Sequence, residues 1–167
     1  MRKVAIDDVD IEVSPLKVHS VRRPVSDALG TEHFAMNYFE LEPGESFSGG
    51  LHTHYDQEEA FYIQSGEATF DVADEPDTDA AESVSVGSGE VIRFPAGEFQ
   101  MGYNDEQNDE PVVGFAFGAP SSSHDFGEIE SAIPCQECGE ETGHGMALTD
   151  NGNFEFTCTQ CGNSFGA

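Results

Sequence analysis

The chain has no tryptophan, only six Lys and Arg residues, and no long hydrophobic run. A membrane-spanning helix needs about 20 apolar residues, and no stretch approaches that length, so we expect no membrane association. The first ten residues, MRKVAIDDVD, lack the apolar core of a secretory signal, which favours a soluble, cytoplasmic protein. The few cations also argue against nucleic acid as a partner, because a phosphate backbone would find little positive charge to pair with.

Acidic residues, in contrast to the basic ones, are abundant. The 33 Asp and Glu give the 167-residue chain a formal charge of −27. The acids are scattered along the sequence and 13 Phe can supply a core, so the composition indicates a folded chain. Self-repulsion on this scale is tolerated in molar salt, where the Debye length falls to roughly 3 Å. We therefore expect a halophilic cytoplasm, with an acidic protein of ordinary origin as the alternative.

Short β-type runs separated by Gly and Pro fill the first 120 residues. Their approximate spacing of ten residues, without any capped helical period, favours an all-β sandwich or barrel over residues 1–120. Residues 121–132, which begin with Ser121 to Ser123, lack an apolar period and are predicted to be a linker. The runs lie at 4–13, 33–45, 58–73, 82–104 and 110–120.

All four cysteines follow that linker, as the pairs CQEC and CTQC separated by nineteen residues. Two such knuckles bring four thiolates to one ion, so residues 133–167 resemble a zinc ribbon whose metal is structural Zn²⁺. Two disulfides are the alternative, disfavoured in an intracellular chain, and a catalytic zinc is disfavoured because four thiolates leave no open position. His144 is expected to be a loop residue. The predicted ligands are Cys135, Cys138, Cys158 and Cys161.

Two histidines one residue apart, His52 and His54, precede the apolar run AFYIQSG. Side chains alternate across a strand, so both imidazoles lie on one face and can converge on one point. Glu59 directly precedes the same apolar run. Because an unpaired carboxylate is costly to bury, it should be solvent-exposed or bound to a cation. Two imidazoles and one carboxylate are the donors of a facial triad, which leaves coordination positions open.

A second segment, GEVIRFPAGEFQMGYN at residues 89–104, completes a longer pattern. The two segments together resemble the cupin superfamily, whose motifs are G-x5-H-x-H-x(3,4)-E-x6-G and G-x5-P-x-G-x2-H-x3-N. The first motif matches at His52, His54, Glu59 and Gly66. With the flanking strands, the resemblance extends from about residue 33 to residue 118.

The chain departs from both motifs at one position each. Ser46 stands where the first motif begins with glycine, and Gln100 replaces the histidine of the second motif. The family spacing permits either Glu58 or Glu59 as the carboxylate, and we favour Glu59 because it alone keeps six residues before Gly66.

The resemblance implies a small barrel of two facing sheets with one divalent metal, Fe, Mn, Ni or Zn, near its mouth. Its ligands would be His52, His54 and Glu59, with Gln100 at the fourth position. An amide oxygen is a weaker donor than imidazole, so Gln100 either coordinates loosely or points away and donates a hydrogen bond to a bound ligand. His19 and His33 are expected to be ordinary strand residues.

Three functions are consistent with this reading. The first is a mononuclear metal enzyme acting on a small molecule, either an oxygenase with iron or an isomerase or lyase with manganese, zinc or nickel. The second is a non-catalytic module that senses a small molecule or metal and contacts a protein partner through the ribbon. The third is a structural barrel that has lost its chemistry. A protein partner or a homodimer is the expected macromolecular contact.

Overall fold

The computed structural model describes residues 1–12, 14, 16–123, 125–149 and 151–166. Positions 13 and 15 of the predicted barrel, 124 of the predicted linker, and 150 and 167 of the predicted ribbon lie outside this description.

Within the described residues the protein is all-β, with thirteen strands and one short α-helix. The first part comprises η1 (Ile6–Asp8), β1 (Val21–Pro24), α1 (Val25–Leu29), β2 (Ala35–Leu41), β3 (His52–His54), β4 (Glu58–Ser65), β5 (Glu67–Ala73), η2 (Thr78–Ala80), β6 (Glu82–Gly87), β7 (Val91–Phe94), β8 (Phe99–Tyr103) and β9 (Val112–Ala119). The second part comprises η3 (Phe126–Glu128), β10 (Ile129–Pro134), β11 (Glu141–Leu148), β12 (Phe154–Cys158) and β13 (Ser164–Gly166). No described helix is long and apolar enough to cross a membrane.

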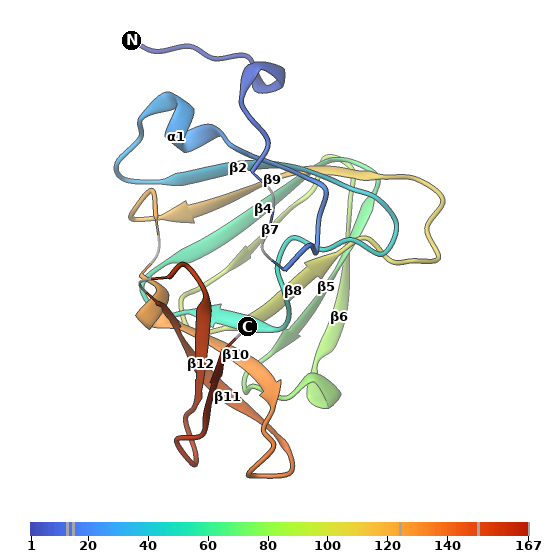
Figure 1. Ribbon diagram of the computed structural model, residues 1–167. Helices are drawn as coiled ribbons and strands as arrows, with labels where there is room; N and C mark the ends of the chain where they lie inside the picture. Colours follow the sequence, from blue (N-terminus) through green and yellow to red (C-terminus); the bar gives the residue numbers. More distant parts are fainter. Residues whose placement is uncertain (13, 15, 124, 150, 167) are drawn as a thin grey trace.

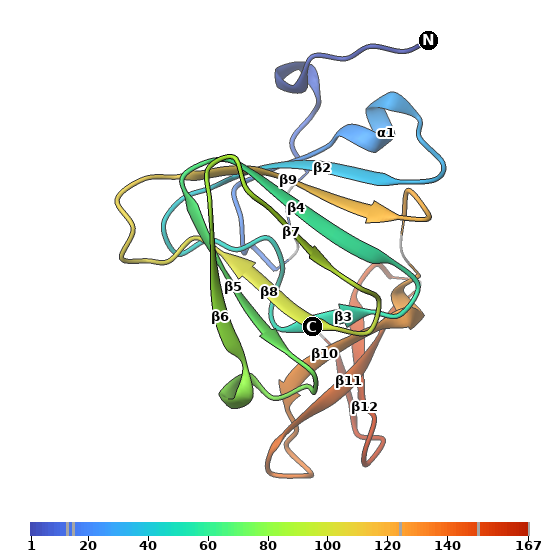
Figure 2. The same ribbon diagram turned by 180° about the vertical axis from the view of Figure 1, so that it is seen from behind.

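Two antiparallel sheets face each other to form the barrel (Figures 1 and 2). One sheet has the order β1-β2-β9-β4-β7, and the other has the order β13-β12-β11-β10-β3-β8-β5-β6. The expected all-β barrel is confirmed, and its nine strands run from Val21 to Ala119. The N-terminal tail with η1, and helix α1, lie beyond the outer side of the first sheet in both views.

Alternating apolar residues of both sheets meet in a phenylalanine-rich core between them. Phe47 packs at its centre, with ring centroids 5.1 Å from Phe39, 5.2 Å from Phe61 and 5.9 Å from Phe70. Edge-on and offset arrangements of this kind add to the stabilisation from buried area.

The ribbon is a continuation of the second sheet. Strand β10 pairs antiparallel with β3 on one side and with β11 on the other. The segment predicted as a linker, residues 121–132, thus contains η3 and most of β10. A second apolar cluster at this junction includes Leu51 and Phe99, with Ala132 packed against them. Local periodicity could not indicate this strand, because its pairing partner lies far away in the sequence.

The same segment is fixed to the barrel before β10 begins. The buried amide of Gln57 donates hydrogen bonds to the carbonyl oxygens of Ser121 at 2.9 Å and Ser123 at 3.1 Å. These bonds span more than sixty residues of sequence. The three serines therefore begin a docked connection rather than a free linker.

Two expectations near the N-terminus differ from the structure. The strand expected over residues 4–13 is replaced, within its described part, by the single turn η1 and irregular chain. This chain touches the first sheet where the Glu12 N–H donates to the Arg22 carbonyl oxygen of β1. Arg23 also holds this chain by donating to the Val9 carbonyl oxygen. His19 and His33 both lie just outside strands. His19 is buried against Phe39, and burial lowers the pKa of its imidazole.

Gly66 closes the turn between β4 and β5 with φ +79°. A Cβ at this position would lie 2.6 Å from the Pro111 carbonyl oxygen and 3.0 Å from the Val112 Cα. Both contacts involve backbone atoms, which cannot move aside without distorting the strand that they belong to. The motif glycine is therefore required by the fold.

We expect Gly66→Ala to lower the free energy of unfolding by about 2–4 kcal/mol, because it combines backbone strain with a steric clash. Chemical denaturation would measure the change. Gly145→Ala is the matched control, since a Cβ on Gly145 meets nothing within 4 Å and its φ is not positive. Equal midpoints for the two variants would contradict the prediction.

Candidate functional site

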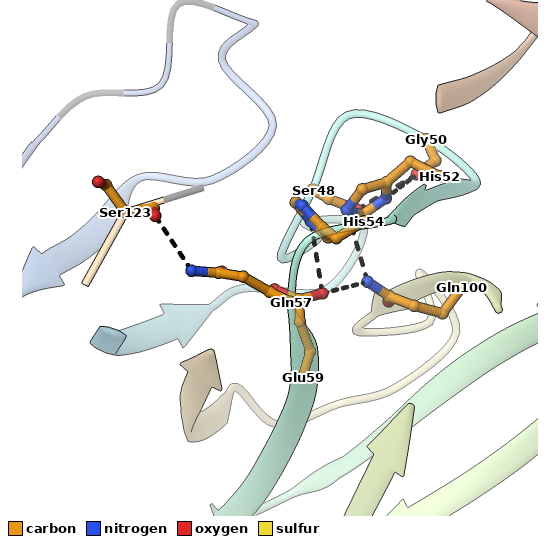
Figure 3. A network of polar contacts seen from close by, with 8 residues as sticks. All are labelled: Ser48, Gly50, His52, His54, Gln57, Glu59, Gln100 and Ser123. Atoms are coloured by element: carbon orange, nitrogen blue, oxygen red, sulfur yellow. Dashed lines mark hydrogen bonds and ion pairs between the residues drawn. The ribbon is translucent and has the colours of Figure 1, made fainter. Parts of the chain in front are cut away.

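Strand β3 is three residues long and carries both histidines. His52 lies directly opposite Gln100 of β8, and His54 lies opposite Ile129 of β10. The two imidazoles share one face of the strand, with ring centroids 5.0 Å apart. The two-residue period of a strand thus places both imidazoles of the His-x-His pattern on one face. Figure 3 shows both rings beside Glu59 and Gln100.

The tautomer of His52 is fixed by a backbone contact. Its Nδ1 lies 2.9 Å from the carbonyl oxygen of Gly50. A carbonyl oxygen only accepts hydrogen bonds, so Nδ1 carries the proton and the lone pair of neutral His52 resides on Nε2. Orientation of a histidine through its other nitrogen is typical of metal ligands.

Glu59 approaches the histidines from the opposite sheet. Its Oε2 lies 3.6 Å from Nε2 of His54, and one ligand atom from each of His52, His54 and Glu59 lies within 4.8 Å of the other two. Glu58 points the other way on β4, where it is exposed and forms an ion pair with Arg93 at 2.5 Å. The structure thus brings Glu59, and not its neighbour, to the two imidazoles.

Gln100 completes the ring of polar groups. Its Nε2 donates to Oε2 of Glu59 at 2.8 Å and lies 3.5 Å from Nε2 of His52. The side chain is 2% exposed, and its Oε1 has no hydrogen-bond partner among the described residues. In this rotamer the amide orients Glu59, and its buried oxygen remains available to another donor or to a cation.

Burial raises the pKa of Glu59 to about 7, with a small additional effect of Asp56, while the hydrogen bond from Gln100 acts in the opposite direction. A carboxylate in this position therefore gives up its charge near neutral pH unless a cation is present. A divalent ion would remove that penalty.

The chemistry of the donors thus fits a divalent cation. Two oriented imidazoles and one carboxylate, with a neutral amide beside them, suit Fe, Mn, Ni or Zn better than Mg or Ca, which prefer oxygen ligands. Three protein donors leave coordination positions for water or a bound molecule.

A cavity of about 470 Å³ lies between the edge strands β6 and β7 of the two sheets, and none of the four site residues lines it. Its lining includes Val72 and Phe94, whose cross-strand partners are Gln100 and Glu59. Residues directly opposite each other on antiparallel strands share one face, so the cavity is one cross-strand pair away from the candidate metal site. Its charged lining residues are Asp74, Glu82, Arg93 and Glu98.

The four cysteines converge at the far end of the ribbon. Sγ of Cys135 lies 3.6 Å from that of Cys161, and Sγ of Cys138 lies 3.9 Å from that of Cys158. These distances are too long for disulfides, and all four cysteines are free. A tetrahedral ion with metal–sulfur bonds of about 2.3 Å has sulfur–sulfur edges of about 3.8 Å, so the cluster fits Zn²⁺.

Each knuckle is built by the same local interaction. The N–H groups of Gly139 and Gly162 donate to the carbonyl oxygens of Cys135 and Cys158, and both glycines have φ +76°. The hydroxyl of Thr142 lies 3.3 Å from Sγ of Cys158. This hydrogen bond, with backbone N–H groups of the knuckle, lowers the pKa of the Cys158 thiol to about 5. These hydrogen bonds thus favour the thiolate form of Cys158.

His144 is not the loop residue that the sequence suggested. It lies in β11, fully buried, directly opposite Cys158. Its Nδ1 donates to the Thr142 carbonyl oxygen at 3.0 Å, and its ring packs on Phe165 at 5.8 Å. A ribbon with few large side chains uses this imidazole as core, a role that residue type alone does not reveal.

Two facing antiparallel sheets with a histidine and carboxylate cluster between them define a double-stranded β-helix barrel. Residues 37–111 match the family model described as Cupin domain. The barrel therefore contains a cupin domain. None of the curated proteins compared matches the chain.

Solved structures with the same fold come from several kinds of protein. The polyketide cyclase RemF from Streptomyces resistomycificus has a TM-score of 0.58 at 21% identity, over 83% of this chain and 90% of that chain. A cupin-superfamily sugar phosphate isomerase from Silicibacter pomeroyi has a TM-score of 0.57 at 20% identity, over 99% and 91%. Oxalate decarboxylase from Lactobacillus farciminis has a TM-score of 0.56 at 18% identity, over 75% and 34%. Identities this low establish the fold alone.

Proposed function

We propose that the barrel holds one divalent metal through His52, His54 and Glu59 and acts on a small molecule at the open coordination positions. The observation that carries the proposal is the convergence of three donors from opposite sheets, one cross-strand pair away from a cavity. The ribbon is proposed to hold one structural Zn²⁺ through its four cysteines.

The side chains around the site have distinct tasks in this proposal. The metal, when bound, acts as a Lewis acid and orients the substrate. Gln100 holds the carboxylate of Glu59 in place, and Gly50 holds the His52 ring in its ligating tautomer. The buried oxygen of Gln100 can accept a hydrogen bond from a substrate hydroxyl or amine.

Charge along the cavity bears on the class of substrate. Asp74, Glu82 and Glu98 line it, while its one cation, Arg93, is already ion-paired with Glu58. Apolar contacts come from residues such as Phe94. We therefore propose an uncharged or cationic small molecule rather than a phosphate ester, because a phosphate would meet like charge at the entrance.

A non-catalytic module that senses a small molecule or metal is the second candidate. It is favoured by the direct pairing of β10 with the histidine strand, which joins the ribbon to the barrel site. A protein partner or a second copy of the chain would then bind the ribbon, in the cytoplasm of a halophile. Turnover of any small molecule by the metal-loaded protein would favour the enzyme over this module.

Metal analysis of the purified protein tests the proposal. We expect two equivalents in the wild type, one of them zinc, and one equivalent in His52→Ala. His33→Ala is the matched control, since His33 is exposed and distant in sequence from either cluster. A single equivalent in both wild type and His52→Ala would refute the barrel site.

The identity of the second metal then selects the assay. If it is iron, oxygen uptake with small phenols, thiols and keto acids tests an oxygenase. If it is manganese, nickel or zinc, neutral sugars and other uncharged compounds test an isomerase or lyase.

A further inference from the structure

Strand β10 lies between β3 of the barrel and β11 of the ribbon (Figure 2), and so connects the strands that carry the two candidate metal sites. At its first residue, Ile129 pairs with His54, and its last residue, Pro134, directly precedes Cys135. Both histidines of the barrel site therefore pair with this six-residue strand, and one cysteine of the ribbon site follows it directly.

The histidine strand depends on β10 for much of its support. Strand β3 pairs with β8 at one position, His52 with Gln100, but with β10 at three positions. On the barrel side, the Gly97 N–H donates to the His54 carbonyl oxygen. Apart from the single pair with β8, the backbone pairs of this short strand are with β10.

The contact continues past the end of β3. The N–H of Tyr55 donates to the Glu128 carbonyl oxygen at 2.8 Å, and the N–H of Asp125 donates to a carboxylate oxygen of Asp56 at 2.9 Å. The chain leading into the ribbon thus runs beside the chain that links His54 to Glu59.

One side chain of β10, Glu130, joins the two sites directly. Its Oε2 accepts a hydrogen bond from Tyr55, the residue after His54, at 2.6 Å. Its Oε1 lies 3.5 Å from the hydroxyl of Thr159, the residue after Cys158. A Cβ on Gly143 would lie 1.6 Å from that same oxygen, so the glycine leaves the space that Glu130 occupies.

We propose that the zinc ribbon is a positioning element for the barrel site: metal in the ribbon orders β10, and β10, through its pairing with β3 and through Glu130, strengthens metal binding by His52 and His54. This inference rests on the proposed function, because it requires metal in both sites. The ribbon is then part of the metal site, and not a separate module.

The proposed coupling comes from the order that zinc in the ribbon gives to β10. Without metal, the ribbon has too little core to fold by itself, so β10 loses its partner β11 and frays from β3. Binding of the barrel metal must then order β3 as well as bind the ion. Part of the binding free energy is spent on that ordering, and the affinity falls.

The test measures Co²⁺ binding to the barrel in the full-length chain. Zinc occupies the ribbon of the wild type, and Cys138→Ser/Cys161→Ser removes it at the two less buried cysteines. We expect the dissociation constant for Co²⁺ to rise about tenfold in the double variant, a coupling of about 1.4 kcal/mol. The same variant with His52→Ala provides the blank for any Co²⁺ bound by the remaining thiolates.

Variants at Glu130 separate positioning from folding, because they keep all four cysteines. Glu130→Ala should weaken Co²⁺ binding at least threefold while the ribbon retains its zinc. Glu130→Gln keeps an acceptor for Tyr55 and should restore most of the affinity. Glu155→Ala, at an exposed carboxylate on β12, is the matched control. Amide hydrogen exchange of β3 should increase in Glu130→Ala and remain unchanged in the control.

The reverse measurement gives an independent check, since coupling between sites is reciprocal. The zinc affinity of the ribbon, measured by chelator competition, should be about tenfold lower without the barrel metal, as in His52→Ala, than with it. Co²⁺ dissociation constants that agree within twofold across wild type, the cysteine variant and Glu130→Ala would overturn the coupling and leave the barrel site intact. No Co²⁺ bound by the wild-type barrel would instead refute the proposed function itself.

Discussion

Replacing Cys158 with serine is expected to abolish zinc binding by the ribbon and to unfold the chain beyond Pro134. Cys158 is 2% exposed, and its Sγ contacts both Cys138 and the hydroxyl of Thr142. A serine hydroxyl at this point does not ionise near neutral pH, so the site loses one of its four thiolate ligands.

The expected effect is large because metal binding is most of the folding free energy of such a segment. Structural zinc in small peptides contributes about 10–16 kcal/mol at neutral pH. The ribbon can replace little of this, since its buried side chains outside the cysteines are few and include the polar His144 and Thr142.

Zinc content and amide hydrogen exchange would check this prediction together. Amides of β11 and β12 should lose protection in Cys158→Ser, whereas those of the barrel strands β4 and β9 should keep it. Gln160→Ser, between the two ligands of the same knuckle, is the matched control and should retain zinc. A Cys158→Ser protein that holds zinc against a chelator as firmly as the wild type would contradict a four-thiolate site.

Short-range patterns in the sequence were sufficient to predict which residues gather at the two sites. The spacing from His52 to Gly66 and from Gly89 to Asn104 predicted a cupin barrel, which the fold and the family match confirm. Alternation along a strand brought the two histidines to one face. The paired cysteines likewise predicted the four-thiolate cluster. In each case the information lies within a few residues, where strand and turn geometry act directly.

Long-range pairing could not be predicted in the same way. The run IESAIP at 129–134 is short and only partly apolar, and it becomes β10 because β3 offers it an open edge. Glu130 and Gln57 acquire their roles from partners more than sixty residues away. Nothing in the local sequence distinguishes Glu130 from the other acids of this highly acidic chain.

The second large effect is expected at Glu59, where Glu59→Gln should weaken metal binding in the barrel at least 100-fold. The substitution keeps the size of the side chain and a hydrogen bond with Gln100, but it removes the one anionic donor of the site. An amide oxygen is a weaker ligand for a divalent cation, and two imidazoles alone hold such an ion loosely. Co²⁺ or Mn²⁺ titration of the two proteins would measure the difference, with Glu58→Gln as the control.

The same variant should stabilise the metal-free protein above pH 7. The pKa of Glu59 is about 7 in the folded state and near 4.5 in the unfolded state. Between these values the folded state binds more protons, so the stability that protonated Glu59 contributes is fully present below pH 4.5 and is lost as the pH rises to about 7. Glu59→Gln removes that loss, which amounts to roughly 3 kcal/mol at most.

Denaturation of the metal-free proteins at several pH values would test the sign. The wild-type free energy of unfolding should fall relative to that of Glu59→Gln between pH 4.5 and 7 and run parallel to it above pH 8. Metal should reverse the order, because only the wild type gains binding free energy, and its affinity should increase as the pH rises toward 7 and Glu59 loses its proton. A constant difference across this range would show that Glu59 ionises normally in the folded barrel. In the wild type, Glu59 therefore lowers the stability of the metal-free barrel at neutral pH, and the same carboxylate supplies the anionic ligand for a divalent cation.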